Sequence, residues 1–428
     1  MLASLALTAT LLALTGSPAV AAPAANRAAP EGHGTCTATA PGSKPQRRGT
    51  AWSCLEAGPA PAWVVSRMTR TAPPAVPTAR AAGPGGSRHD GRTPEELCVD
   101  DSPAAVVSNR LAYCVRGVAR YKRLGADNKV EGEAIVGILI SSGMKETPNA
   151  AWQERVHVVA VEMHNMPDGV SIAVSSTCSG ICTTQGPAWG GSPVILREEG
   201  KGKSDGVLGY SSPVGKGSKA PNIRPSYHLD GRILGGGIPQ PPVNVDQAGP
   251  SLRCDDQVTR WPGCIVEGHM ADVTIRKSLY GAAAVTYEWA QKNLSNPTNN
   301  YGTEKNPLHR DAIGDTDKKR TITCDYAPRF VRDNLLVPDD QCDEFPFAMS
   351  VEGGKPGSMC VDILPQKVAG AWDVANVRIM RGDKATAICV RSHVTKEQNE
   401  GAGRKEVSGA VTSARILDRE PFQVIITD

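Results

Sequence analysis

Residues 341–354 read QCDEFPFAMSVEGG, and this stretch decides how the last third of the chain is interpreted. Three carboxylates, Asp343, Glu344 and Glu352, flank an apolar run that should be buried. The acids either cap a strand and point into water, or they form the acid cluster of an active site. A carboxylate held at the edge of a core has restricted access to solvent, which raises its pKa toward that of a useful base. Asp343, next to Cys342, is the candidate for that base.

The composition favours turn-rich β structure over long helices. The chain has 428 residues, enough for two or three domains of about 150 residues each. It contains 44 glycines and 33 prolines, more than an average globular protein.

The start of the chain predicts export. An apolar run followed by small residues indicates a signal peptide over residues 1–22, with Ala19-Val20-Ala21 as the cleavage site. The alternative is a membrane anchor, but the run is short and no stop-transfer pattern follows. We therefore expect a secreted, extracellular protein without a membrane partner.

The cysteines support the same conclusion. Their number is 12, and an even count is typical of an oxidised secreted protein. Neighbours in sequence form pairs that close short loops, each worth about 3 kcal/mol in the chain-entropy model. The predicted disulfides are Cys36–Cys54, Cys98–Cys114, Cys178–Cys182, Cys254–Cys264, Cys324–Cys342 and Cys360–Cys389. The alternative, zinc at CSGIC (178–182), lacks a second ligand pair at finger spacing.

The chain divides into regions of different pattern. Residues 23–95 are rich in Ala, Pro, Gly and Arg and predict a disordered, low-complexity linker. Residues 96–250 predict a β-rich domain, a sandwich or meander, with strands at 133–141, 156–163 and 169–177. Within it, residues 199–250 predict a long loop.

Residues 251–428 predict a small α+β domain. A helix is expected over 277–294, ending before Pro297, and a second helix places Val407, Ala410, Val411 and Ala414 on one face. Short strands are expected at 345–351, 359–364, 385–390 and 422–426. Acidic and basic residues are nearly balanced here, so the broad basic surface of a tight nucleic-acid binder is missing. The balance is compatible with transient binding through a few local cations and a metal.

Several polar side chains in this region could serve a reaction. His309 is an alternative base, because the unperturbed pKa of imidazole suits neutral pH, or else a surface residue. Arg310, Lys319 and Arg320 could contact phosphate. Asn399, at the start of a helix, is a reasonable ligand for a hard metal ion.

The stretch CDEFPFAMSVEGG resembles the signature of the NucA/NucB family of secreted bacterial nucleases. Three more stretches are similar to long members of that family and follow in the same order: RCDDQVTRWPGC (253–264), NPLHR with KKR and Cys324 (306–324), and NEGAG with ARILDREPFQVII (399–426). Together they cover roughly residues 252–428. The β-rich region is similar to the upstream part of long members only in its general pattern.

The resemblance implies a metal-dependent, sequence-nonspecific endonuclease with a small ββα-metal-like core. Asp343 would be the base, Glu344 and Glu352 would support the base or the metal, and Asn399 would lie beside Mg²⁺ or Mn²⁺. The chain departs from the family pattern at Gln398, and in the following helix Glu406 is the nearest substitute for a missing ligand.

The leading hypothesis is therefore a secreted, monomeric nuclease that hydrolyses DNA, or RNA. The alternative is a disulfide-rich binding or structural protein that keeps the scaffold without catalysis. A third hypothesis is an inhibitor or toxin partner that acts through the β-rich region.

Overall fold

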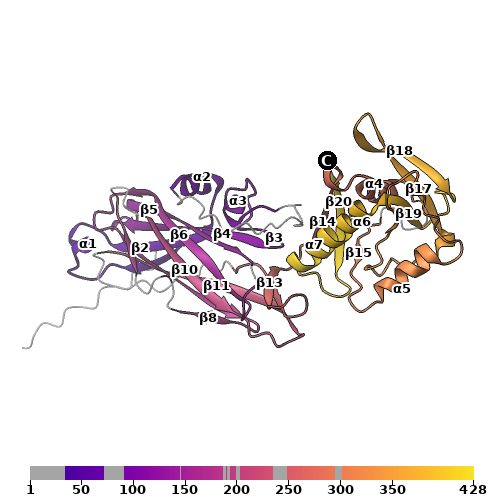
Figure 1. Ribbon diagram of the computed structural model, residues 1–428. Helices are drawn as coiled ribbons and strands as arrows, with labels where there is room; N and C mark the ends of the chain where they lie inside the picture. Colours follow the sequence, from indigo (N-terminus) through magenta and orange to yellow (C-terminus); the bar gives the residue numbers. More distant parts are fainter. Residues whose placement is uncertain are drawn as a thin grey trace, which may run out of the picture.

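The structure is a computed structural model, and it describes residues 34–71, 91–144, 146–186, 189, 193–198, 203–234, 248–294 and 301–428. The predicted signal peptide, residues 1–22, lies outside the described residues. Figure 1 shows a strand-rich N-terminal part followed by a C-terminal part of mixed helices and strands.

The N-terminal part is a sandwich of two antiparallel sheets. The larger sheet has the order β1-β2-β4-β5-β6-β10-β8, with β3 paired to β4, and the smaller has the order β13-β12-β11-β7-β9. The strands of the larger sheet are β1 (Thr35–Ala38), β2 (Trp52–Pro59), β3 (Val106–Asn109), β4 (Ala112–Leu124), β5 (Val130–Gly143), β6 (Ala151–His164), β8 (Thr183–Gln185) and β10 (Lys203–Ser211). Those of the smaller sheet are β7 (Val170–Ser179), β9 (Val194–Leu196), β11 (Lys219–Ile233), β12 (Leu252–Asp255) and β13 (Gly263–Val266).

One core lies between these sheets. Tyr121 and Ile138 of the larger sheet pack with Ile172 and Leu229 of the smaller one, and all are buried. Alternating apolar residues on each strand supply this core, as expected for strands that bury one face. The strands predicted at 133–141, 156–163 and 169–177 are confirmed within β5, β6 and β7.

Helices cover the outer face of the larger sheet (Figure 1). Helix α2 (Ala62–Thr71) buries Val64 and Met68 there, and α3 (Pro94–Cys98) adds Leu97. A Cβ atom on Gly137 would lie 2.0 Å from the sulfur of Met68. Glycine in β5 therefore lets α2 approach the sheet closely. The short helix α1 (Lys44–Arg47) lies at the surface.

Two predictions for this part are wrong. The linker predicted over residues 23–95 is wrong for its described part, which includes β2, paired with β4 over its whole length, and α2, which buries Val64 and Met68. Residues 23–33 and 72–90 of the predicted linker lie outside the described residues. The loop predicted over 199–250 contains β10 and β11, whose pairing with β6 and β7 covers long registers. The high content of glycine, proline and lysine in this segment is typical of a loop, so the alternation that points Tyr227 and Leu229 toward the core was missed.

The C-terminal part is α+β. Its main sheet has the order β16-β19-β17-β18, and a second sheet has the order β14-β20-β15. The strands are β14 (Ala271–Arg276), β15 (Leu308–His309), β16 (Asp340–Phe345), β17 (Cys360–Val368), β18 (Ala371–Arg381), β19 (Cys389–Thr395) and β20 (Pro421–Thr427). The helices and helical turns are α4 (Lys277–Asn293), α5 (Thr316–Arg320), η2 (Thr321–Asp325), η3 (Gly357–Met359), α6 (Lys396–Glu400), η4 (Gly401–Val407) and α7 (Ser408–Ser413).

Helix α4 packs on one face of the main sheet. Tyr287 of α4 contacts Phe345 and Phe347, with ring centroids 5.6 and 4.9 Å away. The helix predicted over 277–294 is confirmed, and so is the buried face of the last helix. The strand predicted at 345–351 is wrong, because β16 ends at Phe345 and a turn follows.

The cysteine pairing is confirmed. All six predicted disulfides are present, and the described residues include no free cysteine. Oxidised cysteines throughout the chain are typical of a protein of an oxidising compartment. Within the described ranges, no helix is both long and apolar enough to cross a membrane.

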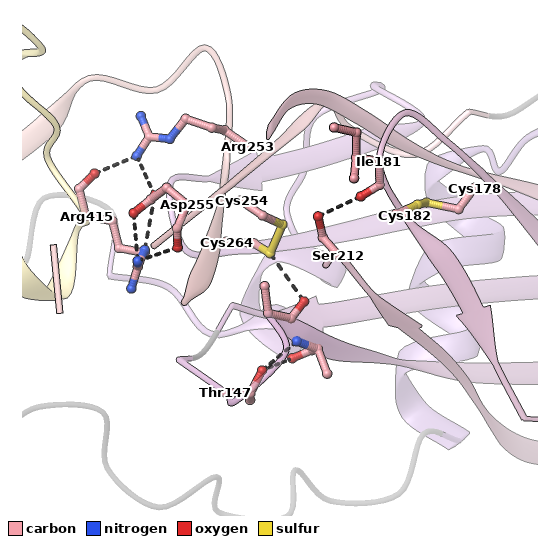
Figure 2. Close-up of a disulfide and its surroundings, with 12 residues drawn as sticks. Thr147, Cys178, Ile181, Cys182, Ser212, Arg253, Cys254, Asp255, Cys264 and Arg415 are labelled. Carbon is pink, nitrogen blue, oxygen red and sulfur yellow. Dashed lines mark hydrogen bonds and ion pairs between the residues drawn. A yellow bond between two sulfur atoms is a disulfide. The ribbon is translucent and has the colours of Figure 1, made fainter. Parts of the chain in front are cut away.

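Buried ion pairs join the two parts. Glu420 accepts hydrogen bonds from Arg110 and Arg253 at 2.7 and 2.8 Å, and Asp255 pairs with Arg415 at 2.7 Å. Figure 2 shows Arg253, Asp255 and Arg415 beside the Cys254–Cys264 disulfide. The boundary predicted at residue 251 therefore falls before the β12–β13 hairpin, which pairs with β11 of the sandwich.

Candidate functional site

Strand β16 carries the two acids that follow Cys342, and it presents them on opposite faces. Successive side chains of a strand point to opposite sides of the sheet. Asp343 is buried and faces α4, whereas Glu344 lines a cleft on the other face. Because β16 runs from Asp340 to Phe345, its alternation separates the pair that the sequence placed in one cluster.

Asp343 belongs to the interface between β16 and α4. It is 3% exposed, and the hydroxyl of Tyr287 donates a hydrogen bond to its Oδ1 at 3.1 Å. Its Oδ2 is buried and has no hydrogen-bond partner among the described residues. Burial, reinforced by the charge of Glu344, raises the pKa of Asp343 well above its usual range. The carboxyl is therefore favoured in its neutral form, which is a poor proton acceptor.

Glu344 lies at the floor of the cleft. The guanidinium Nε of Arg320 is 3.5 Å from its Oε1. Burial raises the pKa of Glu344 to about 7, against the opposing effect of the Arg320 charge. A carboxyl group of this pKa changes its protonation state near neutral pH, which suits a general base.

The cleft is open to solvent and has a volume of about 690 Å³. The Cys324–Cys342 disulfide joins η2 to β16 within its wall. The lining residues are Arg320, Cys324, Asp325, Arg329, Phe330, Val331, Arg332, Gln341, Cys342, Glu344, Asn399, Glu400, Gly403, Arg404 and Ser408. Four of them are arginines and three are acids, so the cleft favours an anion more than the balanced surface around it.

Asn399 lines the same cleft from α6. Its Nδ2 donates to Oε1 of Gln341 at 3.2 Å and, more weakly, to the carbonyl oxygen of Cys342 at 3.4 Å. The side-chain hydroxyl of Thr395 caps the start of α6, which fixes where Asn399 lies. Asn399 and Glu344 therefore line one cleft, and the role of Asn399 as a metal ligand stays a prediction.

His309 and Glu352 form a separate pair. Nδ1 of His309 lies 2.8 Å from Oε1 of Glu352, and the backbone N–H of His309 donates to Oε2 at 3.0 Å. Glu352 therefore orients the imidazole, whose side chain is 41% exposed. Neither residue lines the cleft, so the structure separates Glu352 from Asn399, the other predicted metal ligand.

Two of the three side chains that were predicted to contact phosphate bind other groups of the protein instead. Lys319 pairs with Asp311 and donates to the carbonyl of Ser350, both at 2.6 Å. Arg310 donates to the carbonyl of Ile416, and burial lowers its pKa. Arg320 alone of the three lines the cleft. Glu406, the substitute ligand suggested by the resemblance, is buried and accepts a hydrogen bond from Tyr280 at 2.7 Å.

Several cleft residues were not predicted from the sequence. They are Asp325, Arg329, Arg332, Gln341, Glu400 and Arg404. Glu400 and Arg404 follow Asn399 within one helical turn or so, and this spacing was a usable signal. Arg329 and Arg332 belong to a loop whose position depends on the fold, so nothing in their local sequence marks them.

The oxygen donors of the cleft fit a hydrated cation better than an enclosed one. The described residues include no group of three or more His, Cys, Asp or Glu side chains placed to hold a metal. Mg²⁺ keeps several waters and needs only one or two protein carboxylates together with substrate phosphate. Glu400 and the amides of Asn399 and Gln341 line the cleft and are its candidate ligands for such an ion.

Comparisons of the chain with models of protein families, with curated proteins and with solved structures gave no match.

Proposed function

We propose that the chain is a secreted, metal-dependent nuclease that hydrolyses phosphodiester bonds in the cleft over β16. The observation that carries the proposal is Glu344, a buried carboxylate with a pKa near 7 at the floor of a cleft lined by four arginines. The motifs that resemble the NucA/NucB family support it. The six disulfides support the extracellular location.

Hydrolysis of a phosphodiester requires a deprotonated water, a cation beside the phosphate oxygens and a proton for the leaving oxygen. Glu344 accepts the proton of the attacking water, because its pKa lies near the working pH. Arg320, 3.5 Å from Glu344, contacts the anionic phosphate by charge-assisted hydrogen bonds. The positive charge of Arg320 lowers the pKa of Glu344. When a phosphate group pairs with Arg320, this effect weakens, so the pKa of Glu344 rises and the carboxylate becomes a stronger base.

Asn399 and Glu400 would hold Mg²⁺ or Mn²⁺ at the corner between α6 and β16, with water in the remaining positions. Bound there, the ion would neutralise charge on the phosphate and lower the pKa of its bound water, and that water would supply the proton that the leaving oxygen takes up. Gln341 accepts a hydrogen bond from Asn399 and thereby orients its amide.

The test is cleavage of plasmid DNA and of RNA by the purified protein with Mg²⁺ or Mn²⁺, with and without EDTA. We expect Glu344→Gln to lower the rate about 10²- to 10⁴-fold, the usual effect of removing a general base. Glu304→Gln is the matched control, because Glu304 is exposed and lies outside the cleft.

Equal rates for the parent and Glu344→Gln would contradict the assignment of the base. His309, oriented by Glu352, would then be the next candidate. A parent protein that cleaves neither nucleic acid with any divalent metal would favour the alternative of a disulfide-rich binding protein on the same scaffold.

A further inference from the structure

Residues 329–332 form one wall of the cleft and belong to the loop from Tyr326 to Leu336, called the rim loop below. Tyr326 does not line the cleft itself but follows Asp325, which does. Arg329 and Arg332 lie on this loop, line the cleft and are exposed. Apolar side chains are exposed between and around them: Val331 is 77% exposed and Tyr326 57%. Exposed apolar side chains that gather beside a cleft are typical of a surface that a ligand covers.

The rim loop is held from beneath by a buried anchor. Phe330 is 5% exposed, and its ring lies 4.4 Å from the imidazole of His393. Arg391, fully buried, donates to the carbonyl of Pro328 at 2.8 Å. The backbone N–H of Phe330 donates to the carbonyl of Cys324, whose disulfide reaches β16. With Phe330 fixed inward, the loop presents its neighbours in the chain to solvent.

The cations of the rim loop differ from the other arginines of the cleft. Arg320 pairs with Asp317 and Glu344, and Arg404 lies 4.0 Å from Glu400. Arg329 and Arg332 have no ion-pair partner among the described residues. The guanidinium groups of Arg329 and Arg332, three residues apart in the chain, thus remain available for an external anion.

We propose that the rim loop binds an unpaired nucleic-acid strand next to the phosphate that is cleaved, so that single-stranded nucleic acid is the preferred substrate. This inference rests on the proposed function. A duplex hides its bases, and a protein that grips only its backbone needs cations alone. A single strand offers both phosphates and exposed base faces, and its binding sites combine cationic grooves with aromatic or apolar side chains. The rim loop supplies both kinds of group, with Tyr326 as the stacking side chain.

The experiment measures binding separately from cleavage. Fluorescence anisotropy in EDTA follows the parent protein with a labelled single-stranded 20-mer oligonucleotide, and with the duplex of the same sequence. We expect tighter binding to the single strand. Tyr326→Ala should weaken single-strand binding roughly 5- to 100-fold, as expected for the loss of one base–aromatic stack, and should change duplex binding little.

The arginines are tested by the dependence of binding on salt. Each phosphate contact to a single strand contributes about 0.7 to the slope of log K against log salt. The double variant Arg329→Ala/Arg332→Ala should therefore lower this slope by about 1.4. Arg224→Ala/Arg378→Ala and Trp63→Ala are the matched controls, because these residues are exposed and lie outside the cleft.

Equal affinity for the two oligonucleotides together with unchanged binding by Tyr326→Ala would overturn the inference, as would an unchanged salt slope in the double arginine variant. Failure of the proposed function has a different signature. A parent protein that binds single strands through the rim loop, yet cleaves nothing with Mg²⁺ or Mn²⁺, would keep the rim loop as a single-strand binding site and rule out the nuclease. If the parent cleaves nucleic acid and none of the rim-loop variants changes binding, the nuclease would stand and the rim-loop inference would be wrong.

Discussion

At the scale of single residues, the difference between Asp343 and Glu344 shows what the sequence can and cannot reveal. The stretch CDEFPFAM left open whether its acids point into water or form an active-site cluster, and the structure buries Asp343 and Glu344, both with raised pKa values. The face that each acid occupies depends on where β16 begins and ends. The sequence placed a strand at 345–351, whereas the structure has it at 340–345. The local sequence pattern therefore could not predict that Glu344 faces the cleft.

Asp343→Asn is the substitution that tests this division of roles. Because Asp343 faces Tyr287 and favours its neutral form, we expect the amide to retain cleavage within about tenfold, far above the loss expected for Glu344→Gln. Rates of plasmid cleavage for the two variants, measured side by side, check this. A loss for Asp343→Asn as large as that for Glu344→Gln would return the base to Asp343.

The same variant should change how stability depends on pH. The folded pKa of Asp343 is raised, so its favourable contribution is fully present below the unfolded pKa and is lost as pH rises. Relative to the parent, Asp343→Asn should therefore gain stability between pH 4 and pH 8. Urea unfolding at both pH values measures this difference.

At the scale of elements, the two sheets of the sandwich meet at a buried carboxylate. Glu154 of β6 is fully buried and accepts hydrogen bonds from Tyr113 and Tyr227 on Oε1 and from Tyr210 on Oε2, at 2.5, 2.6 and 2.8 Å. These tyrosines lie on β4, β11 and β10, so one side chain ties together strands of both sheets. Alternation in the sequence predicted β6, but nothing marked Glu154 as an inward position.

Glu154 predicts a pH-dependent stability for the sandwich. Burial raises its pKa from 4.5 to about 7, despite the three hydrogen bonds. Its contribution to stability is thus complete below about pH 4.5 and declines as pH rises to 7, by about 3 kcal/mol in total.

Glu154→Gln should remove that slope, because the amide does not ionise. At pH 4.5, where the carboxyl group of the parent is neutral, the variant should be about 1–3 kcal/mol less stable, since its NH₂ group cannot accept a tyrosine hydrogen bond. This difference should shrink as pH rises toward 8, because only the parent loses stability. Urea unfolding at pH 4.5, 6 and 8 measures both effects. Parallel pH profiles for the variant and the parent would show that Glu154 does not titrate in this range.

The elements also show which patterns in the sequence were informative. Alternation located β7, apolar runs located β5 and β6, and cysteines that are neighbours in sequence gave all six disulfides. Strands β2, β10 and β11 were missed because their glycines, prolines and lysines are typical of loops. Their stability comes from pairing with distant strands, which a local window of sequence does not contain.

At the scale of the whole molecule, the sandwich and the C-terminal part are linked by charges rather than by apolar contact alone. Arg110 and Arg253 converge on Glu420, and Asp255, which is fully buried, pairs with Arg415. The motif RCDDQVTRWPGC was expected to lead into the nuclease domain, and the structure places its β12–β13 hairpin at this junction (Figure 2). The Cys254–Cys264 disulfide closes the same hairpin and holds Arg253 and Asp255 on either side of Cys254.

Asp255→Asn tests whether this junction makes the molecule unfold as one unit. The substitution removes the nearer of the two carboxylates that pair with Arg415 and leaves only Glu146, at 3.7 Å; breaking a buried pair typically costs about 3–5 kcal/mol. We expect one calorimetric transition for the parent, and for the variant an earlier transition or two separate ones, because the cost falls on the contact between the parts. Asp127→Asn is the control, since the Asp127–Lys129 pair is exposed and should leave the melt unchanged. A melt of Asp255→Asn that coincides with the parent would show that Arg415 is solvated at the junction, and that the two parts are coupled by other contacts.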